Sequence, residues 1–274
     1  MLGQDLTAFL SPRHEITPAS RPEVDITRLD TLAPTIASAA PDVVIHAAAF
    51  TAVDECERQP EVAFRVNGEG TRHVAQACRE AGLPMLYVST DYVFDGEKPA
   101  PYVESDAPNP LGVYGRSKLE GEKHVRELLE RYWIVRTSWL FGPHGRNFVR
   151  TVLQQARAGE PSRVVDDQIG APTYTVHLAA ALEAIITRGE HGIYHATSQG
   201  SCSWYEFART IVREAGMDES LVMPVSTAAF GRPARRPRNS RLAATHLQQQ
   251  GLPLLLSWQE GLRCYLLREG VIQN

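Results

Sequence analysis

The sequence predicts an α/β fold: a doubly wound parallel sheet followed by a smaller C-terminal α+β domain. Three observations support it. Short β-branched runs alternate with helical stretches, polar side chains come directly after these runs, and the alternation loosens beyond about residue 148. With 274 residues, 43% hydrophobic and 22% charged, the chain can bury such a core without disulfides or metals. We expect the sheet domain over 1–142, with return segments near 165–185, and the second domain mainly over 143–274.

Each predicted element follows from local composition. The buried strands are apolar and β-branched, and Gly82 and Pro84 are typical helix stop signals after the first predicted helix. In a parallel sheet, chemistry lies beyond the carboxyl ends of the strands. We expect strands over 42–49, 85–89 and 133–137, and helices over 61–81, 115–131, 148–158, 177–188 and 204–215.

The most specific motif is Tyr114-x-x-x-Lys118, in which two residues four apart share one helix face. Such a pair suits the reduction of a ketone by hydride, because the alkoxide that develops needs a proton donor. A phenol has a pKa of about 10, and a nearby cation is expected to lower it. The chain has only three lysines, Lys98, Lys118 and Lys123, so Lys118 stands out. The plainer interpretation is a surface helix that carries an aromatic ring and a charge.

Two further motifs end predicted strands. Ser89-Thr90-Asp91-Tyr92 places hydroxyls where they can bond a substrate carbonyl, although such a run can also be a simple turn. His46 begins a run of small residues, 47–49, against which a flat cofactor can lie. Taken alone, this run is better explained as a tightly packed strand end, with His46 a structural histidine and not a ligand or base. The nine histidines show no His-x-x-x-His pair, so we predict no catalytic metal site.

Composition excludes several functional classes. The net charge of −4 gives no basic field for nucleic acid. We find no apolar run of membrane-spanning length and no signal peptide at the start. The four scattered cysteines suit a reducing compartment. We therefore expect a cytoplasmic protein that binds neither nucleic acid nor membrane.

Several motifs together resemble those of the extended short-chain dehydrogenase/reductases, and within them the dTDP-4-dehydrorhamnose reductases. The resemblance covers nearly the whole chain and implies a Rossmann-like NAD(P)-binding domain, a role in dTDP-rhamnose biosynthesis, a nucleotide-sugar substrate and a homodimer. Tyr-x-x-x-Lys alone marks the superfamily, whereas the other motifs are more specific. They are Pro41 to Asp54, Ser89 to Gly96, Val113 to Lys118, Arg136-Thr137-Ser138-Trp139, Asp167-Gln168-x-Gly170-x-Pro172-Thr173 and Arg236-Pro237-x-Asn239-Ser240-Arg241-Leu242.

The resemblance assigns roles to individual residues. Tyr114 would donate the proton, Lys118 would hold the nicotinamide ribose and tune Tyr114, and Thr90 would bond the reacting oxygen or Tyr114. Asp25 and Ile26 would lie at the adenine and Gly3 at the pyrophosphate, while Ala49, Phe50 and Thr51 would line the cofactor. Asp91 and Trp139 would contact the substrate, and Arg238 and Arg241 would hold its pyrophosphate. A solvated turn is the alternative for the arginines.

The sequence departs from the family at its start. The family opens with a strand and G-x-x-G-x-x-G, of which only Gly3 matches here. Two explanations are open. In the first, which we favour, an internal Met has been taken as the start; in the second, the chain is a genuine truncation that is weakly folded or inactive. For the chain as written we expect weak or absent NADPH affinity.

Other choices stay open. NADP-binding proteins often place Arg or Lys near the end of the second strand. We take the Glu15-Ile16-Thr17 run as that strand, and Ser20-Arg21 after it mildly favours NADPH over NADH. A Mg²⁺ ion near Asp5 is conceivable, although Asp5 is shorter than the family's Glu. Competing functions are epimerisation or dehydration of a nucleotide sugar, and a non-catalytic role like that of the regulatory subunit of methionine adenosyltransferase. The intact Thr90, Tyr114 and Lys118 argue against the non-catalytic role, and Tyr92 after Thr90-Asp91 disfavours dehydration.

Overall fold

The fold is built on a four-stranded parallel sheet, described here by a computed structural model of residues 1–273. The strand order is β1-β2-β3-β8, and neighbours in this order are neighbours in the sheet. Strand β2 pairs with β3 over its whole length, from Met85 beside Tyr132 to Thr90 beside Thr137. The doubly wound prediction is confirmed. The strands are β1 (Val44–His46), β2 (Met85–Thr90), β3 (Tyr132–Thr137) and β8 (Gly192–His195).

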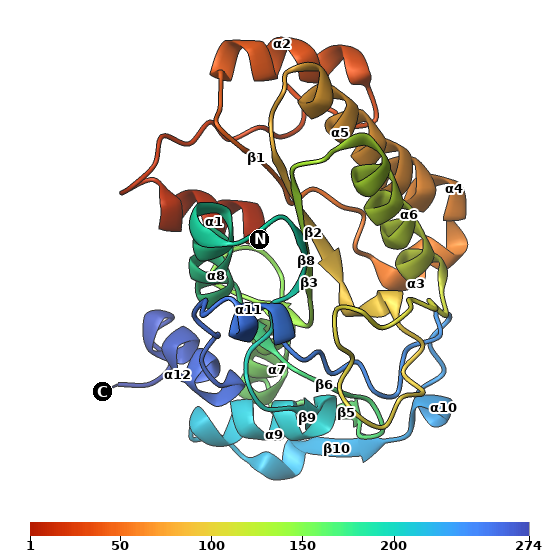
Figure 1. The fold of residues 1–274 in the computed structure, drawn as a ribbon. Coiled ribbons are helices and arrows are strands. Elements are labelled where there is room, and N and C mark those ends of the chain that lie inside the picture. The colour runs from red at the N-terminus through yellow and green to blue at the C-terminus, as the bar shows by residue number, and fades with distance from the viewer. Residues whose placement is uncertain (274) are drawn as a thin grey trace.

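Helices cover both faces of this sheet (Figure 1). The period of two along β2 sends Leu86 and Val88 into one core and Met85 and Tyr87 into the other. The first core is covered mainly by α1 and α8, the second by α2, α5 and α6. Their bounds are α1 (Leu2–Leu10), α2 (Leu29–Ala39), α5 (Gly70–Glu80), α6 (Val113–Leu128) and α8 (Thr175–Arg188).

The helix predicted over 61–81 is present, with a change of winding inside it. The chain passes from α4 through the π-helical segment η1 into α5 without a break. A π-helical segment inside an α-helix often marks a functional site. Here it brings Asn67 into the interior, where its side chain is fully buried. The bounds are α3 (Val53–Arg58), α4 (Pro60–Ala63) and η1 (Phe64–Glu69), and η2 (Asp91–Val93) follows β2.

The C-terminal part forms a second core at the bottom of Figure 1. Aromatic rings fill it, and Phe141 packs against both Phe207 and Tyr265. Helices α7 (Phe148–Arg157), α9 (Trp204–Glu214) and α12 (Trp258–Arg268) surround it. The remaining elements are β4 (Leu140–Phe141), β5 (Ser162–Val165), β6 (Ile169–Gly170), β7 (Thr173–Tyr174), β9 (Cys202–Ser203), η3 (Glu219–Leu221), β10 (Val222–Val225), α10 (Thr227–Phe230) and α11 (Thr245–Gln249).

Two expectations about strands are wrong. The strand predicted over 42–49 is only three residues long, because β1 pairs with β2 alone within residues 1–273 and therefore forms an edge. The Glu15-Ile16-Thr17 run is not a strand but an irregular connection between α1 and α2. A β-prone run forms a strand only where a neighbour supplies hydrogen bonds. No helix in the described part of the chain is long and apolar enough to cross a membrane.

Candidate active site

Helix α6 carries Tyr114 and Lys118 to the carboxyl end of β2. The helix can approach closely because Gly115 has no side chain: a Cβ there would lie 2.1 Å from the carbonyl oxygen of Tyr92. Tyr92 follows Thr90 and Asp91 at the end of β2, so the two predicted motifs meet in space. The rings of Tyr92 and Tyr114 pack edge to face with centroids 5.5 Å apart.

Lys118 is almost completely buried, with 2% of its surface exposed. Its Nζ donates a hydrogen bond of 2.8 Å to the carbonyl oxygen of Val88 and lies 4.1 Å from the centre of the Tyr87 ring. Burial lowers the pKa of Lys118 to about 7, and the charge of Glu122 opposes this shift. The ammonium is thus held in place by β2 and titrates near neutral pH.

The Tyr114 phenol is buried enough that its pKa rises above the ordinary value. Loss of solvation is the main cause, Asp91 adds to it, and a hydrogen bond with the Thr90 side chain opposes it. The expectation that Lys118 lowers this pKa is therefore wrong for this structure, because Nζ is directed at Val88 instead. At neutral pH the phenol keeps its proton, which is the form that a proton donor needs.

Thr90 and Asp91 form a hydrogen-bonded pair at the end of β2. Thr90 Oγ1 donates to Asp91 Oδ1 over 3.0 Å and accepts from the backbone N–H of Tyr92 over 3.2 Å. Asp91 Oδ2 is buried and has no hydrogen-bond partner among residues 1–273. Burial raises the pKa of Asp91 to about 7, against the opposing effect of Ser240 and Thr90. A buried carboxyl oxygen without a partner suits a hydroxyl group of a ligand.

Trp139 lies just beyond β3 in a strained backbone conformation, with φ of 47°. Its indole stacks on that of Trp204, with centroids 3.7 Å apart and ring planes 10° apart. A Cβ at Gly170 would lie 2.5 Å from the Trp139 ring, so only glycine permits this approach. Trp139 is thus fixed by groups from β6 and α9, and Trp204 is a contributor that the sequence patterns did not reveal.

Asn67 is a second residue that the sequence patterns missed. Its side-chain amide accepts from the N–H of Phe50 (2.8 Å) and donates to the Phe50 carbonyl oxygen (3.0 Å) and to Ser117 Oγ (3.0 Å). It therefore ties the loop after β1 to the residue beside Lys118. The available signal was a lone Asn in an otherwise regular helical pattern.

The predicted cofactor-side residues occupy three separate segments. Gly3 lies in the first turn of α1, where a Cβ would meet nothing within 4 Å. Asp25 accepts hydrogen bonds from the backbone and side chain of Thr27 and from Arg21, the first of which chiefly lowers its pKa. Ile26 packs against Gly70. Ala49, Phe50 and Thr51 form the loop that follows β1.

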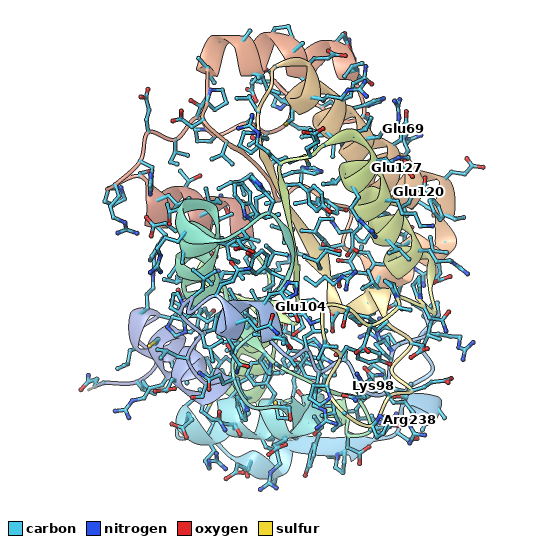
Figure 2. All side chains as sticks on the ribbon, viewed as in Figure 1. Glu69, Lys98, Glu104, Glu120, Glu127 and Arg238 are labelled. Atoms are coloured by element: carbon cyan, nitrogen blue, oxygen red, sulfur yellow. The ribbon has the colours of Figure 1, made fainter. Side chains whose placement is uncertain are left out.

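The predicted phosphate-binding arginines differ in their surroundings. Arg238 is exposed and lines a cavity of about 540 Å³ together with Lys98 (Figure 2). Arg241 lines the same cavity, but its guanidinium donates to Asn239 Oδ1 (2.8 Å) and to the Pro99 carbonyl oxygen (2.5 Å).

Arg236 was not predicted as a site residue. Its Nη2 lies 3.0 Å from Asp54 Oδ1, and it also interacts with the buried Tyr92 that faces Tyr114. Arg232 binds the same carboxylate at 3.0 Å. All three charged residues line a second cavity, of about 530 Å³.

Asp5, the residue considered for a magnesium ion, is buried and already engaged. Its carboxylate accepts hydrogen bonds from Thr175 Oγ1 (2.5 Å) and pairs with His144 Nδ1. Within residues 1–273, no three His, Cys, Asp or Glu side chains are grouped so that they could hold a metal ion. His46 is also engaged: it contacts Thr71 Oγ1 at 3.1 Å, and burial lowers its pKa to about 3.

Comparison with known proteins matches this arrangement to one family. The model of the RmlD substrate binding domain matches residues 1–270. A dTDP-4-dehydrorhamnose reductase from Streptomyces griseus is 43% identical, with 96% of this chain and 88% of that one covered. The chain belongs to the dTDP-4-dehydrorhamnose reductase family.

Two further relatives are similar to this chain over nearly its whole length. A dTDP-4-keto-6-deoxy-D-glucose reductase from Streptomyces niveus is 38% identical over 96% of this chain and 92% of that one. A crystal structure of the Bacillus anthracis dTDP-4-dehydrorhamnose reductase in complex with NADP superimposes with a TM-score of 0.95 and 40% identity, covering 97% and 95% of the two chains. The Rossmann-like fold class is thus confirmed for this reductase family member.

Proposed function

We propose that the protein reduces the C4 ketone of dTDP-4-dehydro-6-deoxy-L-mannose to dTDP-L-rhamnose with NADPH. The juxtaposition of Tyr114, Thr90 and Lys118 carries this proposal, because a protonated phenol, a hydroxyl and a fixed ammonium meet at the end of β2. Relatives over nearly the whole chain are named as reductases of dTDP-linked ketosugars, and one structure contains NADP.

The residues present fit a nicotinamide cofactor. Small side chains follow β1 at positions 47–49. Lys118 Nζ donates to the carbonyl of Val88 and lies over the Tyr87 ring, and a Cβ at Gly3, in the first turn of α1, would meet nothing within 4 Å. The bound nicotinamide supplies a hydride to the carbonyl carbon. Lys118 would hold the ribose, Ala49, Phe50 and Thr51 would line the ring, and Asp25 and Ile26 would lie at the adenine.

The chain's own groups supply the proton and the orientation. Tyr114 holds a proton on its phenol oxygen at neutral pH and would release it to the developing alkoxide. Thr90 would bond the reacting oxygen and so keep it near Tyr114. Asp91 Oδ2, buried without a partner in residues 1–273, would accept or donate a hydrogen bond at a sugar hydroxyl. Trp139 would border the sugar, and Arg238 and Arg241 would bind the diphosphate.

A second candidate substrate is a dTDP-linked 4-keto-6-deoxy-D-glucose, because one relative is named as a reductase of that sugar. The two substrates are distinguished by the configuration of the product. The deciding experiment follows NADPH oxidation at 340 nm with dTDP-4-dehydrorhamnose and assigns the product by NMR. We expect oxidation that depends on the sugar nucleotide and an L-rhamnosyl product. Product formation without net NADPH oxidation would replace reduction by epimerisation, and a D-configured product would favour the second substrate. A parallel assay with NADH measures cofactor preference, and sedimentation tests for a homodimer.

A further inference from the structure

A buried charge network lies one helical turn from Lys118 and is not part of the chemistry proposed above. Glu122 on α6 has 2% of its surface exposed. Arg136 of β3 binds its carboxylate with two bonds, Nε to Oε1 at 3.0 Å and Nη2 to Oε2 at 2.7 Å. Ser89 Oγ donates a third bond to Oε1 over 2.5 Å. Both oxygens of Glu122 are thus held by the sheet.

The network crosses the sheet in one row. Ser89, Arg136 and His195 are direct neighbours on β2, β3 and β8. His195 Nδ1 lies 3.1 Å from the carbonyl oxygens of Tyr102 and Ala243, so Nδ1 carries the proton and Nε2 faces Arg136 Nη1 at 3.5 Å. Burial lowers the pKa of His195 to about 3, which keeps the ring neutral. Arg136 is thus the cation of the pair and Glu122 its anion.

Burying such a network costs free energy of solvation. A buried ion pair seldom contributes more stability than apolar residues of the same volume, because both ions lose their solvation. Packing alone therefore gives little reason for a carboxylate at position 122. The position of Glu122 on α6 gives a better reason for the carboxylate. Lys118 is four residues before Glu122, and residues four apart on a helix lie on the same face.

We propose that Glu122 is a positioning residue: its carboxylate, immobilised by Arg136 and Ser89, is the counter-charge that keeps the buried Lys118 an ammonium able to hold the cofactor ribose. The inference rests on the proposed function for the purpose of that ammonium. The counter-charge itself can be tested without turnover.

The other groups around Lys118 do not supply a negative charge. Tyr87 offers a ring face, and burial raises the pKa of its phenol, so that it stays neutral. His46, whose pKa is lowered in part by the Lys118 charge, is neutral as well. Among the causes that shift the pKa of Lys118, Glu122 is the one that favours the charged form. The titratable or charged groups around the pair are Tyr114 on α6, His46 on β1, Tyr87 on β2, Arg136 on β3 and His195 on β8.

The scarcity of lysine makes a direct test feasible. With lysine labelled with ¹³C at Cε, the protein gives only three lysine signals, from Lys98, Lys118 and Lys123. Lys98→Arg and Lys123→Arg assign them. We expect the Lys118 signal of the unmodified protein to titrate near pH 7, well below the other two. In Glu122→Gln its midpoint should fall by at least about one pH unit, equivalent to a tenfold loss of the ammonium at a given pH.

The matched control is Glu120→Gln, which removes the same charge from the exposed side of α6 (Figure 2). It should leave the Lys118 midpoint unchanged. Glu122→Asp keeps the charge and should hold the midpoint near that of the unmodified protein even where thermal stability falls. A second readout is the dissociation constant of NADPH, which should rise about tenfold in Glu122→Gln at pH 8 and return toward the unmodified value at pH 6.

Several results would overturn the inference. One is an unmoved Lys118 midpoint in Glu122→Gln, and another is an equal fall in Glu120→Gln. If Glu122→Gln does not fold, the unmodified protein alone decides: a Lys118 midpoint below about pH 5 contradicts a counter-charge that holds the ammonium at neutral pH. If the Lys118 midpoint lies near pH 7 and falls in Glu122→Gln, but the protein shows no reductase activity, the proposed function is refuted and the role of Glu122 as a counter-charge stands.

Discussion

The buried face of α6 and the segment 232–241 both bring charged side chains to the same site, under opposite physical conditions. On α6, Lys118 and Glu122 are each 2% exposed and every charged atom has a fixed partner. In the segment 232–241, Arg232 and Arg238 are exposed and border open cavities. Buried charges interact more strongly and are screened less by salt than exposed ones.

This difference indicates a division of labour. The α6 face is preorganised, because its groups have lost their freedom during folding and need no rearrangement when the reaction begins. In the arginine segment, Arg238 is exposed at a cavity, where a charged ligand would supply its partner. Substitutions on α6 should therefore reduce the chemical step or stability, and those in the segment should raise the KM for the sugar nucleotide.

The largest effect is expected for Tyr114→Phe. It removes only the phenol oxygen, so folding and NADPH binding should persist while kcat falls about 10³-fold, within the range for loss of a general acid. Stopped-flow hydride transfer and NADPH fluorescence titration measure the two quantities. Undiminished turnover would remove Tyr114 as the acid, and an equally large loss of NADPH affinity would indicate a structural role.

Asn67→Ala should come next. It leaves the part-buried N–H and C=O of Phe50 and the fully buried Ser117 hydroxyl without their amide partner. Unmade buried hydrogen bonds cost on the order of 1–3 kcal/mol each, so we expect a loss of about 3 kcal/mol in the free energy of unfolding. The cofactor loop loses its anchor as well, so kcat/KM should fall about 30-fold, in line with a small misplacement of reacting groups.

The control for Asn67 is Gln76→Ala, a half-buried position on the same helical stretch whose amide donates to the exposed Glu80. Urea unfolding and steady-state kinetics should leave this control within about twofold of the unmodified protein, as is usual for surface changes. If Asn67→Ala lowers stability with no change in NADPH binding or kcat, the bond to Phe50 serves the fold alone.

Tyr114 and Asn67 also show which site residues can be predicted from the sequence and which cannot. Tyr114 and Lys118 follow from spacing on one helix, and Thr90 follows from its place after a strand, so local patterns were sufficient for them. Asn67 depends on a π-helical turn, and its partners Phe50 and Ser117 are 17 and 50 residues away. Periodicity carries no information on such contacts.

Two other sequence expectations failed for the same reason. The pKa of Tyr114 depends on burial and on the direction of the Lys118 side chain, both set by the packing of α6 on β2 through Gly115. The strand expected over 42–49 is shortened because β1 has a single neighbour in the described residues. The alternation of strands and helices, in contrast, predicted the sheet and the helices on both of its faces.

A smaller effect is expected for Arg236→Ala. If its guanidinium binds the substrate diphosphate, the KM for the sugar nucleotide should rise about tenfold while the KM for NADPH stays within twofold, since one charged contact supplies about 1.5–3 kcal/mol. Asp54→Asn is the matched variant, because it removes the same ion pair from the other side. A diphosphate role predicts an unchanged or lower KM in Asp54→Asn. An equal rise in both variants would show that only the ion pair matters.

The smallest effect should be that of Arg238→Ala. Its side chain is exposed, and exposed ion pairs contribute about 0–1 kcal/mol, so the KM for the sugar nucleotide should rise about threefold. The rise should vanish at 0.5 M NaCl, where the Debye length is a few ångströms. Arg241→Ala is the comparison, since its guanidinium also bonds Asn239 and Pro99: besides the proposed diphosphate contact it removes these bonds, so part of its effect should persist in salt. A salt-independent rise in Arg238→Ala larger than that of Arg236→Ala would place the diphosphate at Arg238 and in the cavity beside Lys98, and would reverse the order of the two arginines.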